Sequence, residues 1–362
     1  MRKDSCLQLV VLSICAIFFA CENKSMSLNT IEVKFDSISD PEIKGIRLNL
    51  EVMGADDMLI YDSLFMVMNS NPDGHLKVFN LRDYSKIADL CLGGRANNEF
   101  IQPFTTANQL YFKDNNLLMP IVDNGTVLKT LNVSASIRQK KTIIDSKENC
   151  PFISLGEVII LEGGGELICW HLTYDDAMDP ETYHQPRYVI KKDGKEKESI
   201  NVFPKYLDTN DKELASALYN CASLKHPHKN IIAQSYYRIG YLMLLNIDSG
   251  QGMAIHVTGT PSFNDKFSGT EIPGRYFGGL VGTDDYFIVR YMGGRSIKEK
   301  PDSYIKIFDW EGKYLGGARL DIDCETHDIA FDDKTNTLYG LDRMQEIFCA
   351  FDLNPLIESI EK

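Results

Sequence analysis

The sequence has few residues of the kinds that metal centres, disulfide scaffolds and nucleic-acid sites require. Only 7 histidines occur in 362 residues, and no two cysteines are spaced as C-x-x-C. Lys and Arg number 38 against 51 Asp and Glu, so the formal net charge is −13. Because phosphate binding needs a basic face, we expect no nucleic-acid partner.

The sequence also lacks the signatures of common enzyme classes. No G-x-S-x-G, H-E-x-x-H, P-loop or G-x-G-x-x-G motif occurs. The glycine run 163–165 lies between Glu162 and Glu166, which suits a tight turn and repels phosphate. We therefore expect no cofactor, no metal site and no catalytic residue, and we favour a binding protein over an enzyme.

The sequence has no hydrophobic run long enough to span a bilayer, which takes roughly 20 residues. Its longest N-terminal run, Leu7 to Ala20, is 14 residues and follows Arg2 and Lys3, as in a secretory signal peptide. The run ends in Ala20-Cys21, which resembles a bacterial lipobox. Cys21 would then be lipidated and become the first mature residue; the alternative is an ordinary signal peptide with a chance cysteine.

These features predict four segments. Residues 1–20 are a lipoprotein signal peptide, 21–30 a flexible tether, 31–355 the folded domain and 356–362 a C-terminal tail. The lipid would bind the membrane, which predicts an outer-membrane lipoprotein of the cell envelope, on the periplasmic or the cell-surface face.

Six cysteines follow Cys21, at positions 91, 150, 169, 221, 324 and 349. An even number in an exported protein permits disulfides. Their spacings are wide and several lie in apolar, strand-like surroundings, so we expect most to be buried thiols, with one disulfide still open.

Most of the chain shows short runs of alternating apolar and polar residues between Gly, Asn and Asp, which is typical of β-strands. The best predicted helix is 210–219, and 356–361 is expected to form one loose turn. The clearest strand series comprises 305–308, 314–320, 328–331, 337–341 and 346–351.

One local pattern recurs along the chain: an apolar strand end followed by Asn or Asp and then a turn. It occurs as Phe79-Asn80, Leu131-Asn132, Leu245-Asn246, Phe308-Asp309 and Phe351-Asp352, with a degenerate copy at 190–194. Asn and Asp suit this place because their side chains bond the backbone of the turn. Six copies separated by 43–63 residues fit four strands each, which predicts an all-β, six-bladed β-propeller; the alternative is a β-sandwich.

A propeller must join its last blade to its first. The early strand 31–35 has no evident neighbour in sequence, and little chain remains after residue 353. We therefore expect 31–35 to pair with the last blade and to close the ring, because this removes two free sheet edges.

The chain resembles the TolB-like six-bladed propeller lipoproteins of Bacteroidetes. The resemblance rests on the lipobox at Cys21, on Phe79-Asn80, and on 93–100 (GGRANNEF), which is similar to a Gly-x-Gly-Pro-Gly-Glu-Phe loop with Ala96, Asn97 and Asn98 substituted. Residues 327–342 are similar to the start of an NHL-type blade. The resemblance implies the fold and the anchoring, but no settled activity and no catalytic residue.

In a propeller, the loops before the innermost strands meet at one mouth of the central channel. The densest polar cluster, Glu325, His327 and Asp328, precedes such a strand. Other candidate ligand-binding residues on corresponding loops are Arg95, Glu99, His226, His228, Arg275 and Tyr276. The alternatives are a loop that caps its own strand, an Arg95–Glu99 ion pair, and a solvated loop at 226–228.

We therefore predict a non-enzymatic binding or scaffold module for an envelope protein, a peptide or a glycan. One alternative is a metal-dependent hydrolase or lactonase with Glu, Asn and Asp ligands in the central channel. A lyase-like or glycan-binding propeller is a further, weaker alternative.

Overall fold

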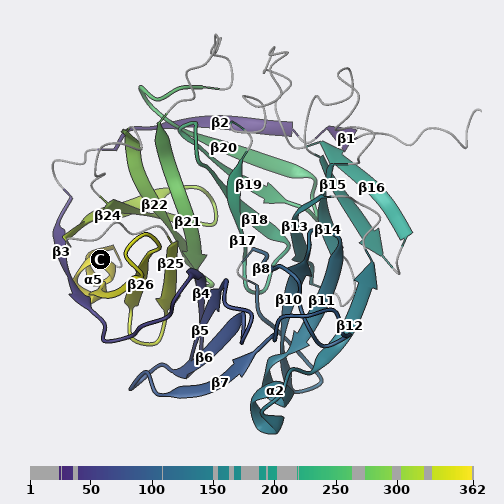
Figure 1. The fold of residues 1–362 in the computed structure, drawn as a ribbon. Helices are drawn as coiled ribbons and strands as arrows, with labels where there is room; N and C mark the ends of the chain where they lie inside the picture. Colours follow the sequence, from purple (N-terminus) through teal and green to yellow (C-terminus); the bar gives the residue numbers. More distant parts are fainter. Residues whose placement is uncertain are drawn as a thin grey trace, which may run out of the picture.

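The computed structural model describes residues 24–25, 27–35, 40–107, 109–149, 154–162, 167–172, 187–192, 195–201, 218, 220–262, 274–295, 303–321 and 328–360. In this part of the chain the secondary structure is almost all strand, with two short helices, so the prediction of an all-β fold is confirmed. Figure 1 shows the sheets arranged around a central axis.

Consecutive strands form antiparallel sheets whose first strand lies nearest the axis and whose last strand lies at the rim (Figure 1). The first sheet comprises β4 (Ala55–Tyr61), β5 (Leu64–Asn69), β6 (Leu76–Asn80) and β7 (Lys86–Leu90). The second comprises β8 (Pro103–Thr105), β9 (Tyr111–Lys113), β10 (Asn116–Asp123), β11 (Val127–Asn132) and β12 (Ile144–Asn149).

The third sheet comprises β13 (Ser154–Ile160), β14 (Leu167–Leu172), β15 (Arg187–Lys192) and β16 (Lys195–Asn201), and the fourth β17 (Cys221–Lys225), β18 (Ile231–Tyr236), β19 (Tyr241–Asn246) and β20 (Gln251–Val257). Then follow β21 (Arg275–Gly282), β22 (Tyr286–Arg295), β23 (Ser303–Asp309) and β24 (Tyr314–Asp321), and finally β25 (Asp328–Asp332), β26 (Thr337–Asp342) and β27 (Ile347–Asp352).

The recurring Asn or Asp ends one strand in each of five sheets, at β6, β11, β19, β23 and β27. At each of these ends a side-chain oxygen accepts a hydrogen bond from a backbone N–H two to four residues later. The pairs are Asn80 with Arg82, Asn132 with Ala135, Asn246 with Ser249, Asp309 with Glu311 and Lys313, and Asp352 with Asn354. The physical reason given for the pattern is confirmed at these five copies.

The N-terminal strands pair differently from the prediction. β2 (Ser27–Val33) lies parallel to β20 in the fourth sheet, so the expected pairing of 31–35 with the last blade is wrong. A later strand, β3 (Glu42–Arg47), pairs antiparallel with β27 and parallel with β24. An exposed edge was available at β20 as well as at β27, and the sequence pattern of a short strand does not distinguish them.

The segment predicted as a flexible tether also contains strand. β1 (Lys24–Ser25) pairs with β16, and β2 begins at Ser27. Backbone pairing therefore fixes residues 27–30 at the rim of the fourth sheet, so a flexible tether cannot extend to residue 30.

Two helices lie outside the sheets. α2 (Val133–Gln139) is capped by the side chain of Asn132, and α5 (Asn354–Ile360) packs on β24, where the sequence predicted only a loose turn. The predicted helix 210–219 lies almost wholly outside the described residues. No helix in the described part of the chain is long and apolar enough to cross a membrane.

The core consists of side chains packed between neighbouring sheets. The first and last sheets meet through Phe65 on β5, whose ring lies 5.4 Å from that of Tyr339 and 5.9 Å from that of Phe348. The same buried cluster includes Val67 and Leu341. Residues almost 300 positions apart therefore share one core.

The chain between β2 and β3 is attached by a buried ion pair. The fully buried Lys306 on β23 pairs with Asp40, whose side chain is 6% exposed. The ammonium also lies 4.9 Å from the ring centroid of Phe35 and 5.9 Å from that of Tyr314. This cluster joins the N-terminal segment to the sheet of β21–β24.

We expect Lys306→Met to lower the free energy of unfolding by about 3–5 kcal/mol, because it leaves the Asp40 carboxylate buried without its cation. The urea midpoint measures this loss. Lys334→Met is the matched control, because Lys334 pairs with Asp62 while both side chains stay about 60% exposed. Equal midpoints for the two variants would contradict the assignment.

Candidate functional site

A cavity of about 500 Å³ lies at the axis. Its wall includes Asp56 and Asp57 from β4, 103–105 from β8, 221–223 from β17, Gly279 and Leu280 from β21, and Asp328 from β25. Its volume falls within the range of small-molecule sites. The innermost strands of five sheets thus build the cavity.

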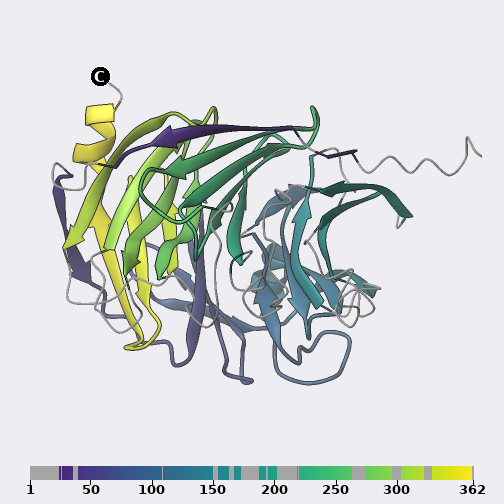
Figure 2. The ribbon, with the colours of Figure 1, turned by 90° about the horizontal axis from the view of Figure 1, so that it is seen from above.

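The topology explains why these residues meet. The first strands of the sheets run in the same direction, so most of the lining residues come from the beginnings of these strands. The turns between second and third strands reach the same end, and they add Ser70 and His75 after β5 and Arg343 after β26. Figure 2 shows the β26–β27 hairpin and α5 on opposite faces of the molecule. The face that bears the hairpin is therefore the one at which the cavity lies.

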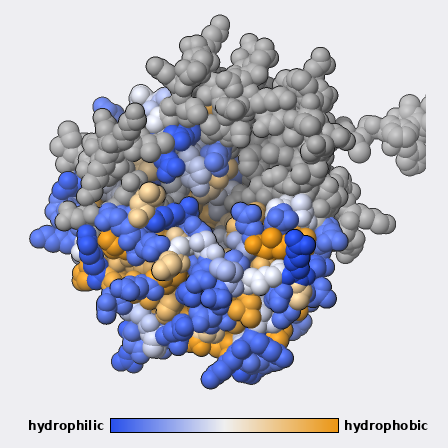
Figure 3. All heavy atoms as spheres, viewed as in Figure 1, coloured by the Kyte–Doolittle hydropathy of each residue, from blue (hydrophilic) through white to orange (hydrophobic). Residues whose placement is uncertain are grey.

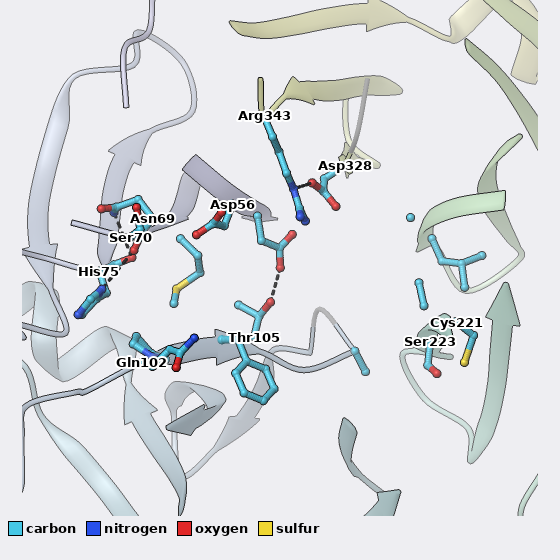
Figure 4. Close-up of a pocket in the computed structure, with 18 of the residues that line it drawn as sticks. Asp56, Asn69, Ser70, His75, Gln102, Thr105, Cys221, Ser223, Asp328 and Arg343 are labelled. Atoms are coloured by element: carbon cyan, nitrogen blue, oxygen red, sulfur yellow. Dashed lines mark hydrogen bonds and ion pairs between the residues drawn. The ribbon is translucent and has the colours of Figure 1, made fainter. Parts of the chain in front are cut away.

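Polar side chains of three sheets lie in the cavity wall, and a hydrogen bond joins two of these sheets (Figure 4). The Thr105 hydroxyl on β8 donates to Oδ2 of Asp57 on β4, and the backbone N–H of Met58 donates to Oδ1 at 2.8 Å. Arg343 pairs with Asp328 in the last sheet. The second, first and last sheets thus contribute side chains to one polar group.

Asp57 is the carboxyl group most changed by this environment. It lies deep in the molecule, although part of its surface stays open to the cavity. Loss of hydration, followed by the nearby charge of Asp328, raises its pKa to about 7, against the lowering effect of the Thr105 hydrogen bond. A strongly perturbed acid in a cavity is a candidate functional group.

His75 and Asn69 lie on the opposite side of the cavity from Cys221 and Ser223 (Figure 4). His75 is 6% exposed, and its Nδ1 lies 3.2 Å from the carbonyl oxygen of Asn69. Its Nε2 is buried and has no hydrogen-bond partner among the described residues. Such an atom is uncommon in a folded protein.

Of the predicted ligand-binding residues that the structure describes, Asp328 alone lines the cavity. Glu325 and His327 lie outside the described residues. Arg275 and Tyr276 begin β21 near the same end, and the N–H of Tyr276 donates to the carbonyl oxygen of Tyr237, a wall residue, at 2.8 Å. Burial raises the pKa of the Tyr276 hydroxyl.

The loop that contains Arg95 and Glu99 is held by its own backbone. The Glu99 carboxylate accepts from the N–H of Ala96 at 2.9 Å, and Gly94 has φ +153°, where a Cβ would meet that carboxylate. Phe100 is buried beneath Lys129, 4.4 Å away. Arg95 is exposed and forms no ion pair with Glu99, so this loop caps itself.

His226 and His228 lie in the turn between β17 and β18, at the opposite end of the strands. His226 is buried 4.8 Å from the ring of Trp310, its Nδ1 accepts from the N–H of His228 at 3.0 Å, and burial lowers its pKa. His228 is exposed, and its Nε2 lies 3.4 Å from Asp284. The two histidines therefore do not converge with Asp328.

No group of three or more His, Cys, Asp or Glu in the described ranges has an arrangement that could hold a metal ion. Cys91, Cys221 and Cys349 are thiols, and Cys91 and Cys349 are buried. Burial raises the pKa of the Cys91 thiol, which makes it a poor nucleophile.

Comparison with solved structures shows what the fold is similar to. An exported protein from Bacteroides fragilis NCTC 9343 matches with a TM-score of 0.52 and 12% identity over 90% of this chain and 99% of that one. A member of the DUF4221 family from Bacteroides vulgatus matches with a TM-score of 0.50 and 9% identity, over 86% and 96%. The solved structures to which this chain is similar are propeller-like, and at these identities the similarity shows the fold alone.

No protein-family model matches the sequence, and no curated protein matches it. The resemblance to the TolB-like family therefore stays a prediction.

The cavity residues that sequence reasoning missed are Asp57, Thr105, His75 and Arg343. None belongs to a motif. Their position in the repeat could have indicated them. Asp57 and Thr105 lie in innermost strands, as Asp328 does, and Arg343 lies in the turn after β26.

We expect Asp57→Asn to stabilise the protein at neutral and alkaline pH. Because the folded pKa of about 7 exceeds the ordinary aspartate value of 3.8, folding is favoured by the protonated carboxyl, and this stability is lost as pH rises from about 4 to 7. The variant removes the loss, which we place on the order of 2–4 kcal/mol. Urea denaturation at pH 4 and pH 8 should show a gain at pH 8 only; the same gain at both values would contradict the raised pKa.

Proposed function

We propose that the chain is a six-bladed β-propeller, closed by β3 as the fourth strand of the last blade. We further propose that it is a non-enzymatic binding or scaffold module for a protein, peptide or glycan. The observation that carries the proposal is the axial cavity, built by five sheets and containing a perturbed, accessible carboxyl group. Rigid inner strands hold these side chains in place, as a preformed binding site requires.

The mouth of this cavity suits a macromolecular partner. Met344 follows Arg343 in the β26–β27 turn and is 82% exposed, and Ile101, a wall residue before β8, is 52% exposed. Figure 3 shows apolar side chains scattered among polar ones over the described part of this face. Met344 and Ile101 would contribute apolar surface to a protein contact at this mouth.

We also propose that Cys21 carries a lipid that anchors the chain to the outer membrane. β1 and β2 lie at the rim of the sheets (Figure 1). A lipid attached before Lys24 would therefore join the protein at the rim and not at the axis. The cavity mouth would then stay accessible to a partner.

Cys21→Ala should abolish acylation and release the protein from membranes. Metabolic labelling with an alkyne fatty acid, followed by fractionation, measures both effects; the buried thiol variant Cys91→Ala is the control and should label as the wild type does. An unlabelled wild type would show that the cysteine follows an ordinary signal peptide by chance, and labelling of Cys21→Ala at the wild-type level would show that the lipid is attached elsewhere.

A photoreactive amino acid at Met344 should crosslink to an envelope component in intact cells, because it stands at the cavity mouth. The matched control is Phe112, which is 57% exposed on β9, toward the opposite end of the strands. Ala222→Trp places a large side chain in the cavity and should reduce the yield of crosslinks from position 344 at least severalfold. The melting temperature of this variant checks that it is folded. Equal crosslinking from both positions, or none from Met344, would oppose the proposal.

A further inference from the structure

The cavity carries more negative than positive charge. Its wall contains three carboxylates, Asp56, Asp57 and Asp328, and one guanidinium, Arg343. Arg343 is already paired with Asp328. Among the described residues, neither Asp56 nor Asp57 has an ion-pair partner, so the cavity disfavours an anionic ligand and favours a cationic one.

The carboxylate of Asp57 can accept more hydrogen bonds than it receives in the protein. Its two oxygens accept one bond each, from Thr105 and from the N–H of Met58, whereas a carboxylate has about four acceptor sites. Part of the side chain remains open to the cavity. A donor that carries positive charge would meet both the free acceptor sites and the uncompensated charge.

His75 gives a second, independent indication of a donor. Because its Nδ1 faces the carbonyl oxygen of Asn69 at 3.2 Å, Nδ1 carries a proton and donates to that oxygen. In the neutral ring Nε2 is an acceptor, and it is buried without any partner among the described residues.

The remaining wall is suited to an aliphatic chain. Met68, Phe104 and Leu280 contribute apolar surface between the polar groups. Methylene groups packed there would leave water, which favours binding. A ligand with charged ends and an apolar middle matches this distribution.

We propose that the cavity binds a primary ammonium group on an aliphatic chain, with Asp57 as its counter-ion. The group belongs either to a free diamine or to a lysine side chain presented by a peptide. The inference rests on the proposed binding function and names its ligand chemistry.

Binding of such a cation is coupled to a proton. The charged and titratable groups around Asp57 are Asp56 on its own strand, Asp328 on β25, Arg343 after β26 and His75 on the cavity wall. Asp57 must ionise to pair with the ammonium, so its proton passes to solvent. With a folded pKa of about 7, binding at pH 7 releases about half a proton, and affinity falls roughly a hundredfold from pH 8 to pH 5.

Isothermal titration calorimetry of the full chain tests this with two cationic probes, cadaverine and the tripeptide acetyl-Ala-Lys-Ala-amide. Runs in two buffers of different ionisation enthalpy count the protons released. The matched neutral probes are 1,5-pentanediol and the same peptide with an acetylated lysine. The two cationic probes distinguish a free diamine from a lysine side chain, and binding of either one supports the proposal.

Asp57→Asn should weaken binding at pH 8 by about tenfold or more and remove both the proton release and most of the pH dependence. Asp83→Asn is the control, because Asp83 lies exposed in the β6–β7 turn, at the far end of the sheet, and should bind as the wild type does. A pH dependence that persists in Asp57→Asn would overturn the role of Asp57. Equal affinity for charged and neutral probes, or no binding of either cation, would overturn the ligand class.

These outcomes are separable from the proposed function. If position 344 crosslinks to an envelope component and Ala222→Trp removes the crosslink, the binding function is supported even when neither cationic probe binds in the calorimeter. The ammonium proposal fails on its own if the wild type then binds neither cation.

Discussion

The contact between the first and last sheets is the constraint on which the rest of the structure depends. Phe65 on β5 packs against Tyr339 and Phe348 across almost 300 residues of sequence. Each sheet has two apolar faces, so a chain of such sheets leaves a face exposed at both ends unless the ends meet. That contact also brings Asp57 and Arg343 to the same side of the axis. The electrostatics of the cavity are therefore a consequence of how the sheets are joined.

The sequence predicted the strands and turns well because their causes are local. The Asn and Asp residues that follow apolar strand ends bond the backbone of their own turns, and a bond spanning two to four residues is visible in a linear pattern. The pairing of the N-terminal strands was not predictable in the same way. β2 and β3 each meet a sheet edge hundreds of residues away, and either edge offers the same row of backbone groups. Lys306, which holds the segment between them, looks like an ordinary strand lysine until the fold buries it against Asp40.

In the candidate site, too, the features that the sequence predicted have local causes, and those it missed depend on distant parts of the chain. Asp328 was identified because it precedes an innermost strand, which is a topological argument that needs only the repeat. Asp57 and Thr105 lie inside innermost strands rather than before them, with no cluster of polar residues to mark them, so that argument did not identify them. In contrast, the conspicuous segments Arg95–Glu99 and His226–His228 serve their own loops, through the Ala96 N–H and through Trp310. Density of polar residues in sequence thus indicated turns more often than it indicated the cavity.

A carboxyl group without an ion-pair partner at the axis lowers the free energy of unfolding when it ionises. This loss of stability argues against a purely structural role. A structural role would be served as well by asparagine, whose Oδ1 could accept from the Met58 N–H while its Nδ2 donates to the Thr105 hydroxyl oxygen, without a charge to desolvate. Asp57 instead loses hydration, faces Asp328, and destabilises the fold as it ionises. The charge of Arg343 stabilises the ionised Asp57 only in part, because that guanidinium is paired with Asp328. A group that weakens the free protein and remains open to a cavity is most simply explained by a ligand that pairs with it, because the same unmet charge that lowers stability is then available as binding energy.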